Sequence, residues 1–340
     1  MTLTGMRATL AVALLASCAP AQQLINGAGA SFPYPMYTKW FDSYHKKLPN
    51  YQFNYQSIGS SGGIKQITEG TVDFGASDGP MTDEQIKAYK DKHGFGILHF
   101  PTVLGAVVPI YNVPGVAQLN FTGAALAGIF LGKITKWNDP ELAKANPGVN
   151  LPAKDIVVVH RAEGSGTSYV WTDFLSKVSP DWKSTVGTNA NPKWPVGTGG
   201  KNSDGVAGQV KQIANSIGYV ELIFAVQNKI SYGKVKNASG VFLEASLAGV
   251  TAAAEKAAKT MPEDFRVSIT NADGKDAYPI STFTWLLVPE KIADGNKKKA
   301  ITDFLKWMLS DGQGMTEALD YAKLPKPVID KEMKAIAKIQ

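Results

Sequence analysis

The sequence predicts an α/β fold with largely parallel sheets. Along much of the chain a short apolar run is followed by a turn rich in Gly and Ser, and then by an amphipathic stretch of helical period. The apolar run at residues 156–159, for example, leads through the turn at residues 164–167 into an amphipathic stretch at residues 169–177. This repeated order of strand, turn and helix is typical of parallel α/β sheets.

The length and composition allow more than one such unit. The chain has 340 residues, 44% of them hydrophobic and 19% charged, which is ordinary globular usage and suggests about two domains. Residues 101–109 and 279–289 are apolar, extended and bounded by prolines. Each of these stretches is a candidate for a strand that crosses between two lobes.

The remaining elements follow from the spacing of apolar residues. The pattern predicts helices at residues 33–48, 60–69, 83–92 and 247–259, the last of them on the surface, and short strands at residues 51–55 and 71–76. Residues 187–205 are rich in Gly, Asn and Pro and are predicted to form a long loop.

The N-terminus has the features of an export signal. Residues 8–16 form an apolar run that is too short to span a bilayer but has the length of a signal-peptide core. The sequence LASC, which ends at Cys18, resembles a bacterial lipobox, whereas cleavage after Ala21 is the alternative. Because the single cysteine lies where a lipobox needs it, we expect a signal peptide at residues 1–17 and a lipid on Cys18. The mature protein is then located in the periplasm or at the cell surface, and the membrane contact is its lipid anchor alone.

The charge balance excludes some classes of partner. There are 35 basic and 29 acidic residues, giving a net charge of +6, and the arginines are Arg7, Arg161 and Arg266. A nucleic-acid-binding protein would show clustered Arg and Lys among aromatic residues, so no nucleic-acid partner is expected. The small excess fits the steering of a small anion.

Metal and cofactor sites are not predicted. A single cysteine excludes a disulfide framework and a multi-cysteine metal site. The histidines, which show no paired metal-ligand spacing and are expected to be structural, are His45, His93, His99 and His160.

Three motifs share a design that suits an anion. In residues 27–32, 59–63 and 161–168 a strand ends, Gly and Ser or Thr form a tight turn, and a helix begins. A helix N-terminus offers free N–H donors and a partial positive charge, and glycine lets a ligand approach the backbone. A single Ser or Thr at such a place is usually a helix cap. Three such motifs together, one beside Arg161, predict an anion pocket.

Arg161 and Asp78 indicate which anion. A guanidinium matches phosphate oxygens in a fork geometry, although Arg161 could instead form an ordinary surface ion pair with Glu163. Asp78 is either a turn residue or a carboxylate that accepts a hydrogen bond from a protonated anion. Phosphate keeps a proton near neutral pH and sulfate does not, so a carboxylate would select phosphate and repel sulfate.

Enzyme motifs are incomplete. The dinucleotide-binding pattern lacks its third glycine at Phe32, and the P-loop pattern has Pro195 and Asn202 at two required positions. Ser165 lacks the glycines that flank a hydrolase nucleophile. We therefore expect a protein that is not an enzyme, with an exported phosphatase as the less favoured alternative.

These motifs resemble a known family. Residues 25–33, 58–63, 73–78 and 161–168, extended by residues 131–134, 194–197 and 217–221, are similar to the phosphate-binding protein (PstS type) of the bacterial phosphate ABC transporter. The resemblance implies a type II periplasmic-binding-protein fold with a hinge of two crossing strands. It also implies a discontinuous lobe I at residues 18–104 and 276–340, and a lobe II at residues 105–275.

The resemblance further implies a site and a role. The residues expected to contact inorganic phosphate are Ser31, Phe32 (through its backbone), Ser60, Asp78, Arg161, Ser165, Gly166 and Thr167. Glu163 is expected to hold Arg161; the family often has Asp there, and Thr in place of Ser31. The implied role is to capture phosphate and deliver it, as a monomer, to the permease and ATPase subunits of the transporter. Another protonated tetrahedral oxyanion, such as arsenate, is the alternative ligand.

Overall fold

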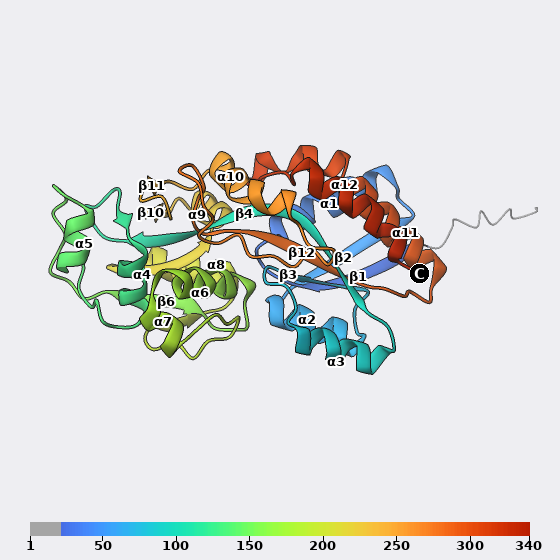
Figure 1. Ribbon diagram of the computed structural model, residues 1–340, viewed down its shortest axis with the longest axis horizontal. Helices are drawn as coiled ribbons and strands as arrows, with labels where there is room; N and C mark the ends of the chain where they lie inside the picture. The colour runs from blue at the N-terminus through green and yellow to red at the C-terminus, as the bar shows by residue number, and fades with distance from the viewer. Residues whose placement is uncertain (1–21) are drawn as a thin grey trace, which may run out of the picture.

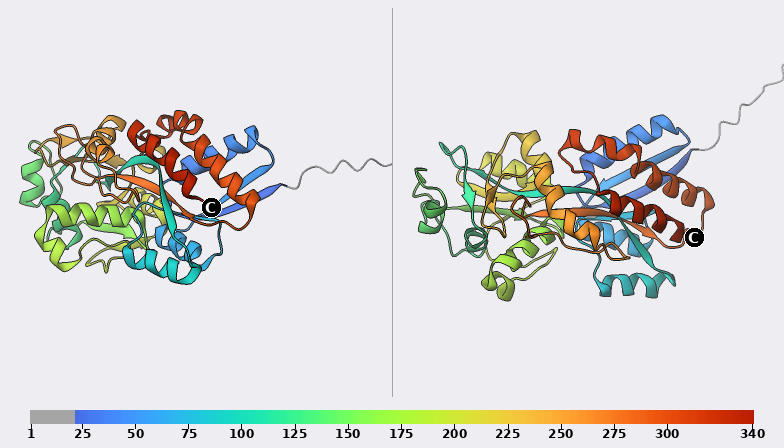
Figure 2. Two further views of the ribbon diagram at one scale, coloured as in Figure 1. Left: turned by 45° about the vertical axis from the view of Figure 1, so that its right-hand side comes forward. Right: turned by 45° about the horizontal axis from the view of Figure 1, so that its top comes forward.

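The protein has two α/β halves joined by long strands (Figures 1 and 2). The computed structural model describes residues 22–340, so the predicted signal peptide and Cys18 lie outside the described residues. Within residues 22–340, no helix has the length and apolar character needed to cross a membrane.

The first half, here called lobe I, is built on the strand order β2-β1-β3-β12. The first three strands are parallel and β12 is antiparallel to β3. The strands are β1 (Gln23–Gly29), β2 (Tyr51–Ser57), β3 (Phe74–Ser77) and β12 (Ser281–Pro289). Helices α2 and α3 lie on one face of the sheet, and α1, α11 and α12 lie on the other (Figure 1). These helices are α1 (Tyr34–Lys47), α2 (Ser60–Glu69), α3 (Asp83–His93), α11 (Gly295–Met308) and α12 (Lys326–Ala335), with 3-10 turns at Asp311–Met315, Glu317–Leu319 and Ile336–Lys338.

The second half, lobe II, continues the sheet in the order β4-β8-β6-β7. Strands β6 (Val157–Arg161), β7 (Thr198–Gly200) and β8 (Ser216–Glu221) are parallel to one another. The helices of this lobe are α4 (Gly123–Phe130), α5 (Pro140–Ala145), α6 (Gly166–Val178), α7 (Pro180–Thr185), α8 (Asn202–Gln212) and α9 (Leu222–Asn228). Short strands complete it: β5 (Asn120–Phe121), β9 (Ser231–Tyr232), β10 (Lys234–Lys236) and β11 (Phe242–Leu243).

Strand β4 (Ile97–Asn112) belongs to both lobes. Its first part pairs with β12, and its last six residues pair with β8. The crossing strand predicted at residues 101–109 is therefore present. The second crossing lies beside it, where the amide of Val107 donates to the carbonyl of Ile280 at 2.8 Å. The extended stretch predicted at residues 279–289 contains β12, which lies in the lobe I sheet, and the crossing itself falls at its start, near Ile280. The lobe boundaries given above stay a proposal.

Aromatic side chains fill much of the two cores, and one of them also bonds to the backbone of the candidate site. In lobe I, Phe53 stacks on Phe41 with ring centroids 5.2 Å apart. In lobe II, the rings of Trp171 and Tyr219 stack at 4.9 Å, and both side chains are fully buried. Burying such large side chains is the main source of stability in each lobe. The hydroxyl of Tyr219 also accepts from the amide of Arg161 at 3.2 Å, which ties the end of β6 to the core.

Some predicted elements differ from those observed. The stretch at residues 187–205 is not one loop, because β7 and the start of α8 lie within it. Helix α6 starts at Gly166 rather than residue 169, since Ser165 caps its first turn. Helix α10 (Leu247–Lys259) has the predicted bounds, but one side of it is buried against β4 and β12.

Candidate functional site

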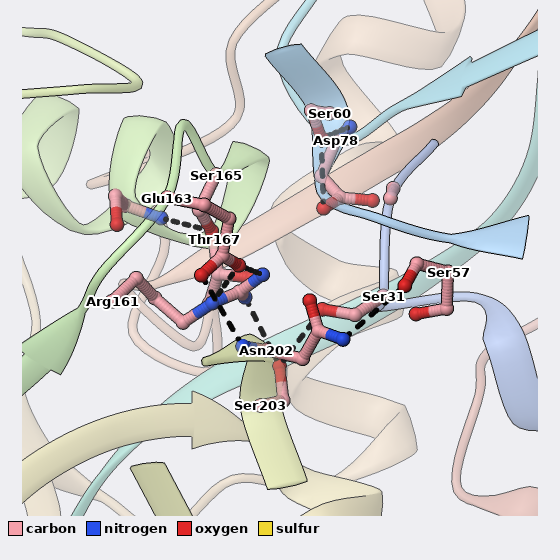
Figure 3. A network of polar contacts seen from close by, with 12 residues as sticks. Ser31, Ser57, Ser60, Asp78, Arg161, Glu163, Ser165, Thr167, Asn202 and Ser203 are labelled. Carbon is pink, nitrogen blue, oxygen red and sulfur yellow. Dashed lines mark hydrogen bonds and ion pairs between the residues drawn. The ribbon is translucent and has the colours of Figure 1, made fainter. Parts of the chain in front are cut away.

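The three predicted anion motifs meet at the junction of the two lobes (Figure 3). Ser31 follows β1, Ser60 opens α2 and Asp78 follows β3, all in lobe I; Arg161 ends β6 and Gly166 opens α6 in lobe II. Carboxyl ends of parallel strands and N-termini of the following helices lie at one edge of such sheets, which is where α/β proteins bind ligands. The fold thus brings together residues that are more than 100 positions apart.

Arg161 is buried and bonded to three side chains of lobe II, namely Glu163, Thr167 and Ser203. The residue is 2% exposed. Its Nε donates to Glu163 Oε1 at 2.7 Å, and its Nη2 contacts the same oxygen. Its Nη1 donates to Thr167 Oγ1 at 2.9 Å and to Ser203 Oγ at 3.2 Å. The ion pair with Glu163 that the sequence suggested is present, but at a buried guanidinium rather than on the surface. Burying such an ion pair carries a desolvation penalty in free energy, and hydrogen bonds to both charged groups are needed to offset it.

Helix α6 presents its N-terminus beside Arg161. Ser165 caps the helix, its Oγ accepting from the amide of Ser168 at 3.2 Å. The cap role and a ligand role are compatible, because a hydroxyl that accepts from an amide keeps its own proton to donate. Thr167 Oγ1 donates to Glu221 Oε1.

Asp78 lies opposite, in lobe I, and is 1% exposed. Its Oδ1 accepts from Thr284 Oγ1 at 2.8 Å, and its Oδ2 accepts from Ser60 Oγ at 3.4 Å. It does not cap α3, since Thr82 does so. Asp78 lies in the bend that follows β3, but its carboxyl is buried there and bonded to side chains from two elements.

The surroundings of Asp78 favour its neutral form. Burial raises its pKa to about 8, and the nearby carboxylate of Glu221 adds to the rise. Thr284, Arg161 and Ser60 act in the opposite direction and stabilise the charged form. Burial has the largest effect on this pKa, because an ionised carboxylate loses its strong hydration when the site excludes water. A buried carboxyl whose pKa is strongly raised by desolvation and a charged neighbour is a functional-site candidate.

Ser31 reaches across the junction. Its Oγ lies 3.2 Å from Ser203 Oγ at the start of α8, and both residues are buried. Phe32 is also buried, and its carbonyl accepts from the hydroxyl of Tyr321. The turn that contains Ser31 and Phe32 is thus fixed from both sides.

Glycines allow the lobes to touch. A Cβ on Gly166 would lie 2.4 Å from Ser60 Oγ and 2.6 Å from Asp78 Oδ2, and a Cβ on Gly164 would lie 2.2 Å from Ser61 Oγ. The amide of Ser61 donates to the carbonyl of Gly164 at 3.1 Å, a backbone bond between the lobes. Only the missing side chains permit this approach. Beside this contact, a cavity of about 300 Å³ separates α2 from α6 and is bordered by Ser60, Gly166, Tyr169 and Asn189.

Several functional candidates escaped the sequence analysis. Ser203 and Asn202 lie at the start of α8, inside the predicted loop; Asn202 donates through Nδ2 to the carbonyl of Ser57 in lobe I at 3.2 Å. Glu221 lies in the 217–221 motif, which gave no chemical signal of its own. Thr284 is on β12, and nothing local to that strand marks it. Within residues 22–340, no cluster of His, Cys, Asp and Glu has the arrangement of a metal site.

Two lobes that enclose a buried polar site at the carboxyl ends of their strands define a bilobal binding protein. The PBP superfamily domain matches residues 16–312 of the chain. The chain is 45% identical to phosphate-binding protein PstS of Pasteurella multocida (strain Pm70), over 91% of this chain and 88% of that protein. It is also 45% identical to phosphate-binding protein PstS of Xylella fastidiosa (strain Temecula1), over 92% of this chain and 84% of that protein. The chain belongs to the PstS family of phosphate-binding proteins.

A solved structure agrees on the fold. The phosphate-binding protein of Stenotrophomonas maltophilia superposes with a TM-score of 0.70 at 21% identity, covering 92% of this chain and 93% of that one. The resemblance inferred from the motifs is therefore confirmed, and so is the fold class. The relatives are named as binding proteins, not enzymes.

Proposed function

We propose that this protein captures inorganic phosphate between its lobes, outside the cytoplasmic membrane, and delivers it to the permease and ATPase subunits of an ABC importer. Membership of the PstS family supports the ligand class. The observation that carries the proposal is the pairing, in one buried site, of the cation Arg161 with the carboxyl Asp78. A site for a fully ionised anion would not be expected to contain a buried carboxyl, because such an anion has no proton to donate to it.

In this proposal lobe II supplies the cation and lobe I supplies selectivity. From lobe II, Arg161, the Ser165 hydroxyl and the first-turn amides of Gly166 and Thr167 donate to the phosphate, with Glu163 holding the guanidinium. From lobe I the contacts are Ser31, the Phe32 backbone, Ser60 and Asp78. Three helix N-termini surround the anion, which favours negative charge there.

Asp78 distinguishes phosphate from sulfate by a proton. When the carboxyl is ionised, it accepts a hydrogen bond from the hydroxyl of HPO₄²⁻, whereas sulfate has no proton to donate. Sulfate would then set two buried negative charges against each other. A pKa near 8 places the ionised carboxyl above that pH, so discrimination is tested most cleanly on the alkaline side.

Binding is coupled to closure of the lobes. Contacts such as Ser61–Gly164 and Ser31–Ser203 join residues of different lobes, and a ligand held by both lobes favours the state in which they meet. The closed surface is the form that we propose the permease recognises. No chemical step is required of any residue, and the protein acts as a monomer.

Export and anchoring are part of the proposal. They rest on the apolar run at residues 8–16 and on the lipobox-like sequence ending at Cys18. A Cys18→Ala variant should lose metabolic labelling by a radioactive fatty acid and appear in the soluble fraction. Unchanged labelling would contradict the lipid site.

Calorimetric titration of the stripped mature protein tests the ligand. At about pH 8.5, above the Asp78 pKa, phosphate should bind one to one with a large heat, and sulfate should give none. Phosphatase assays on the same sample should show no turnover. Sulfate binding comparable to phosphate binding would contradict the role of Asp78, and absence of phosphate binding would contradict the function.

A further inference from the structure

Glu221 is a buried carboxylate that the phosphate-contact set does not include. It is the last residue of β8 and is 1% exposed. One of its oxygens accepts from Thr167 Oγ1, and the other accepts from Ser203 Oγ at 2.7 Å. Thr167 belongs to α6 and Ser203 to α8. A single carboxylate thus connects three elements of lobe II behind the site.

The direction of these hydrogen bonds follows from counting protons. Arg161 Nη1 donates to both Thr167 Oγ1 and Ser203 Oγ, at 2.9 and 3.2 Å. A guanidinium has no acceptor, and each hydroxyl has one proton. Since the two hydroxyls receive from Arg161, each passes its own proton to Glu221. The carboxylate therefore orients both hydroxyls and, through their lone pairs, the plane of the guanidinium.

The same proton count also gives the direction of a hydrogen bond to lobe I. Ser203 Oγ also lies 3.2 Å from Ser31 Oγ. Because the proton of Ser203 points to Glu221, Ser31 is the donor in this contact between the lobes. Glu221 therefore sets the direction of a hydrogen-bond chain that crosses the junction from Ser31.

Glu221 also acts on Asp78 through its charge. Its carboxylate helps to hold the pKa of Asp78 above the usual range, second to burial. The charged group that opposes it is Arg161. The other titratable neighbours that interact with Asp78 are Tyr37, Tyr55 and Tyr321, and burial keeps all three neutral by raising their pKa values. Removing the charge of Glu221 should therefore leave Asp78 ionised to lower pH.

We propose that Glu221 is a positioning residue of the phosphate site: its carboxylate orients the hydroxyls of Thr167 and Ser203 and, through them, the guanidinium of Arg161. This inference rests on the proposed function. It assigns to Glu221 no contact with phosphate.

The test compares three variants by phosphate titration between about pH 6 and about pH 9. Glu221→Gln keeps the shape but has one acceptor in place of two, and no charge. Glu221→Asp keeps the charge on a shorter stem. Glu332→Gln is the matched control, since Glu332 is also fully buried but lies on α12, outside the site network, and burial raises its pKa well above the usual range.

Glu221→Gln should weaken phosphate binding by about ten- to a hundredfold, by analogy with metal sites, where removing the partners that orient the ligands has an effect of this size. Its pH dependence should also shift to lower pH. Glu221→Asp should lose less affinity and keep the pH dependence of the wild type. Glu332→Gln should bind as the wild type does.

Each outcome has a distinct meaning. If the wild type binds no phosphate, the proposed function fails and this inference fails with it. If the wild type binds and Glu221→Gln matches it in affinity and pH dependence, only the inference is overturned. If Glu221→Gln and Glu221→Asp lose the same phosphate affinity at every pH, the role of Glu221 is purely structural and the inference is also overturned. Should Glu221→Gln not fold, Ser203→Ala removes one of the two partners and should lower affinity several-fold; no change would overturn the proposal.

Discussion

The candidate site has two sides, here called walls, one formed by lobe I residues and one by lobe II residues, and they differ in how they hold charge. The lobe II wall holds Arg161 between Glu163, Thr167 and Ser203, so that its charge is fixed in place by bonds within one lobe. The lobe I wall holds Asp78, a carboxyl whose pKa is raised to about 8 and which therefore changes its charge near neutral pH. From this contrast we propose that lobe II supplies affinity, through a permanent cation, and that lobe I supplies selectivity, through a titrating group.

The largest effect should come from removing the cation of lobe II. Arg161→Gln deletes the charge and leaves Glu163 without its partner. Truncating one member of a buried charge pair typically costs about 2–5 kcal/mol, so phosphate affinity should fall by about thirtyfold or more in calorimetry. Lys136→Gln, at an exposed lysine that pairs with Asp155 within lobe II, is the control and should bind normally. A small loss for Arg161→Gln would contradict the division of roles.

The contact between the walls should be sensitive to a single methyl group. In Gly166→Ala the new Cβ meets Ser60 Oγ and Asp78 Oδ2 well inside van der Waals contact. The lobes should then fail to meet, affinity should fall by about tenfold or more, and small-angle scattering should show no compaction with phosphate. Gly208→Ala, on α8 with no atom near the new Cβ, should behave as the wild type. Normal compaction of Gly166→Ala would show that this close approach is not needed.

Lobe I should reveal its titrating carboxyl in the pH dependence of stability. With a pKa of about 8 when folded and 3.8 as the ordinary value, Asp78 binds more protons in the folded protein between these limits. Its contribution to stability is therefore present at low pH and is lost as pH rises toward and through about 8. The Tm of the wild type minus the Tm of Asp78→Asn should therefore fall by at least about 2 °C from pH 5 to pH 9, because the wild type alone loses this contribution. A difference that does not change with pH would contradict the raised pKa.

The smallest effect should come from shortening the residue that holds the guanidinium. Glu163 accepts from Arg161 Nε through Oε1 and from the amide of Asn202 through Oε2, at 2.7 and 3.2 Å. Glu163→Asp cannot keep both bonds without movement, so phosphate affinity should fall by less than about tenfold. Glu255→Asp, at an exposed position of α10, is the control. A loss as large as that of Arg161→Gln would mean that Glu163 does more than hold Arg161.

The sequence indicated the parts of the candidate site that carry a local signal. The Gly/Ser turns at Ser31, Ser60 and Ser165 precede helices, and such turns are visible in a single stretch of sequence. The isolated Arg161 also stands out, because the chain has few arginines. Strand β4 was detectable from the mostly apolar, proline-bounded stretch at residues 101–109.

The missed residues depend on tertiary contacts. Ser203 was hidden by glycines and asparagines that looked like a loop, although α8 starts there. Thr284 contacts Asp78 from a strand more than 200 positions away, and Glu221 gains its partners only when α6 and α8 pack beside β8. The pKa of Asp78 is likewise set by burial, which no local pattern reports.

The most direct test of the two-wall account is the ratio of phosphate to sulfate affinity in wild type and Asp78→Asn, titrated at about pH 8.5. An asparagine offers an amide donor in place of the carboxylate acceptor, so the variant should bind sulfate, and the ratio should fall by about a hundredfold or more. Asp73→Asn, at a lobe I aspartate that pairs with Lys297, should keep the wild-type ratio. If Asp78→Asn still excludes sulfate, selectivity does not come from Asp78 and the central claim is wrong.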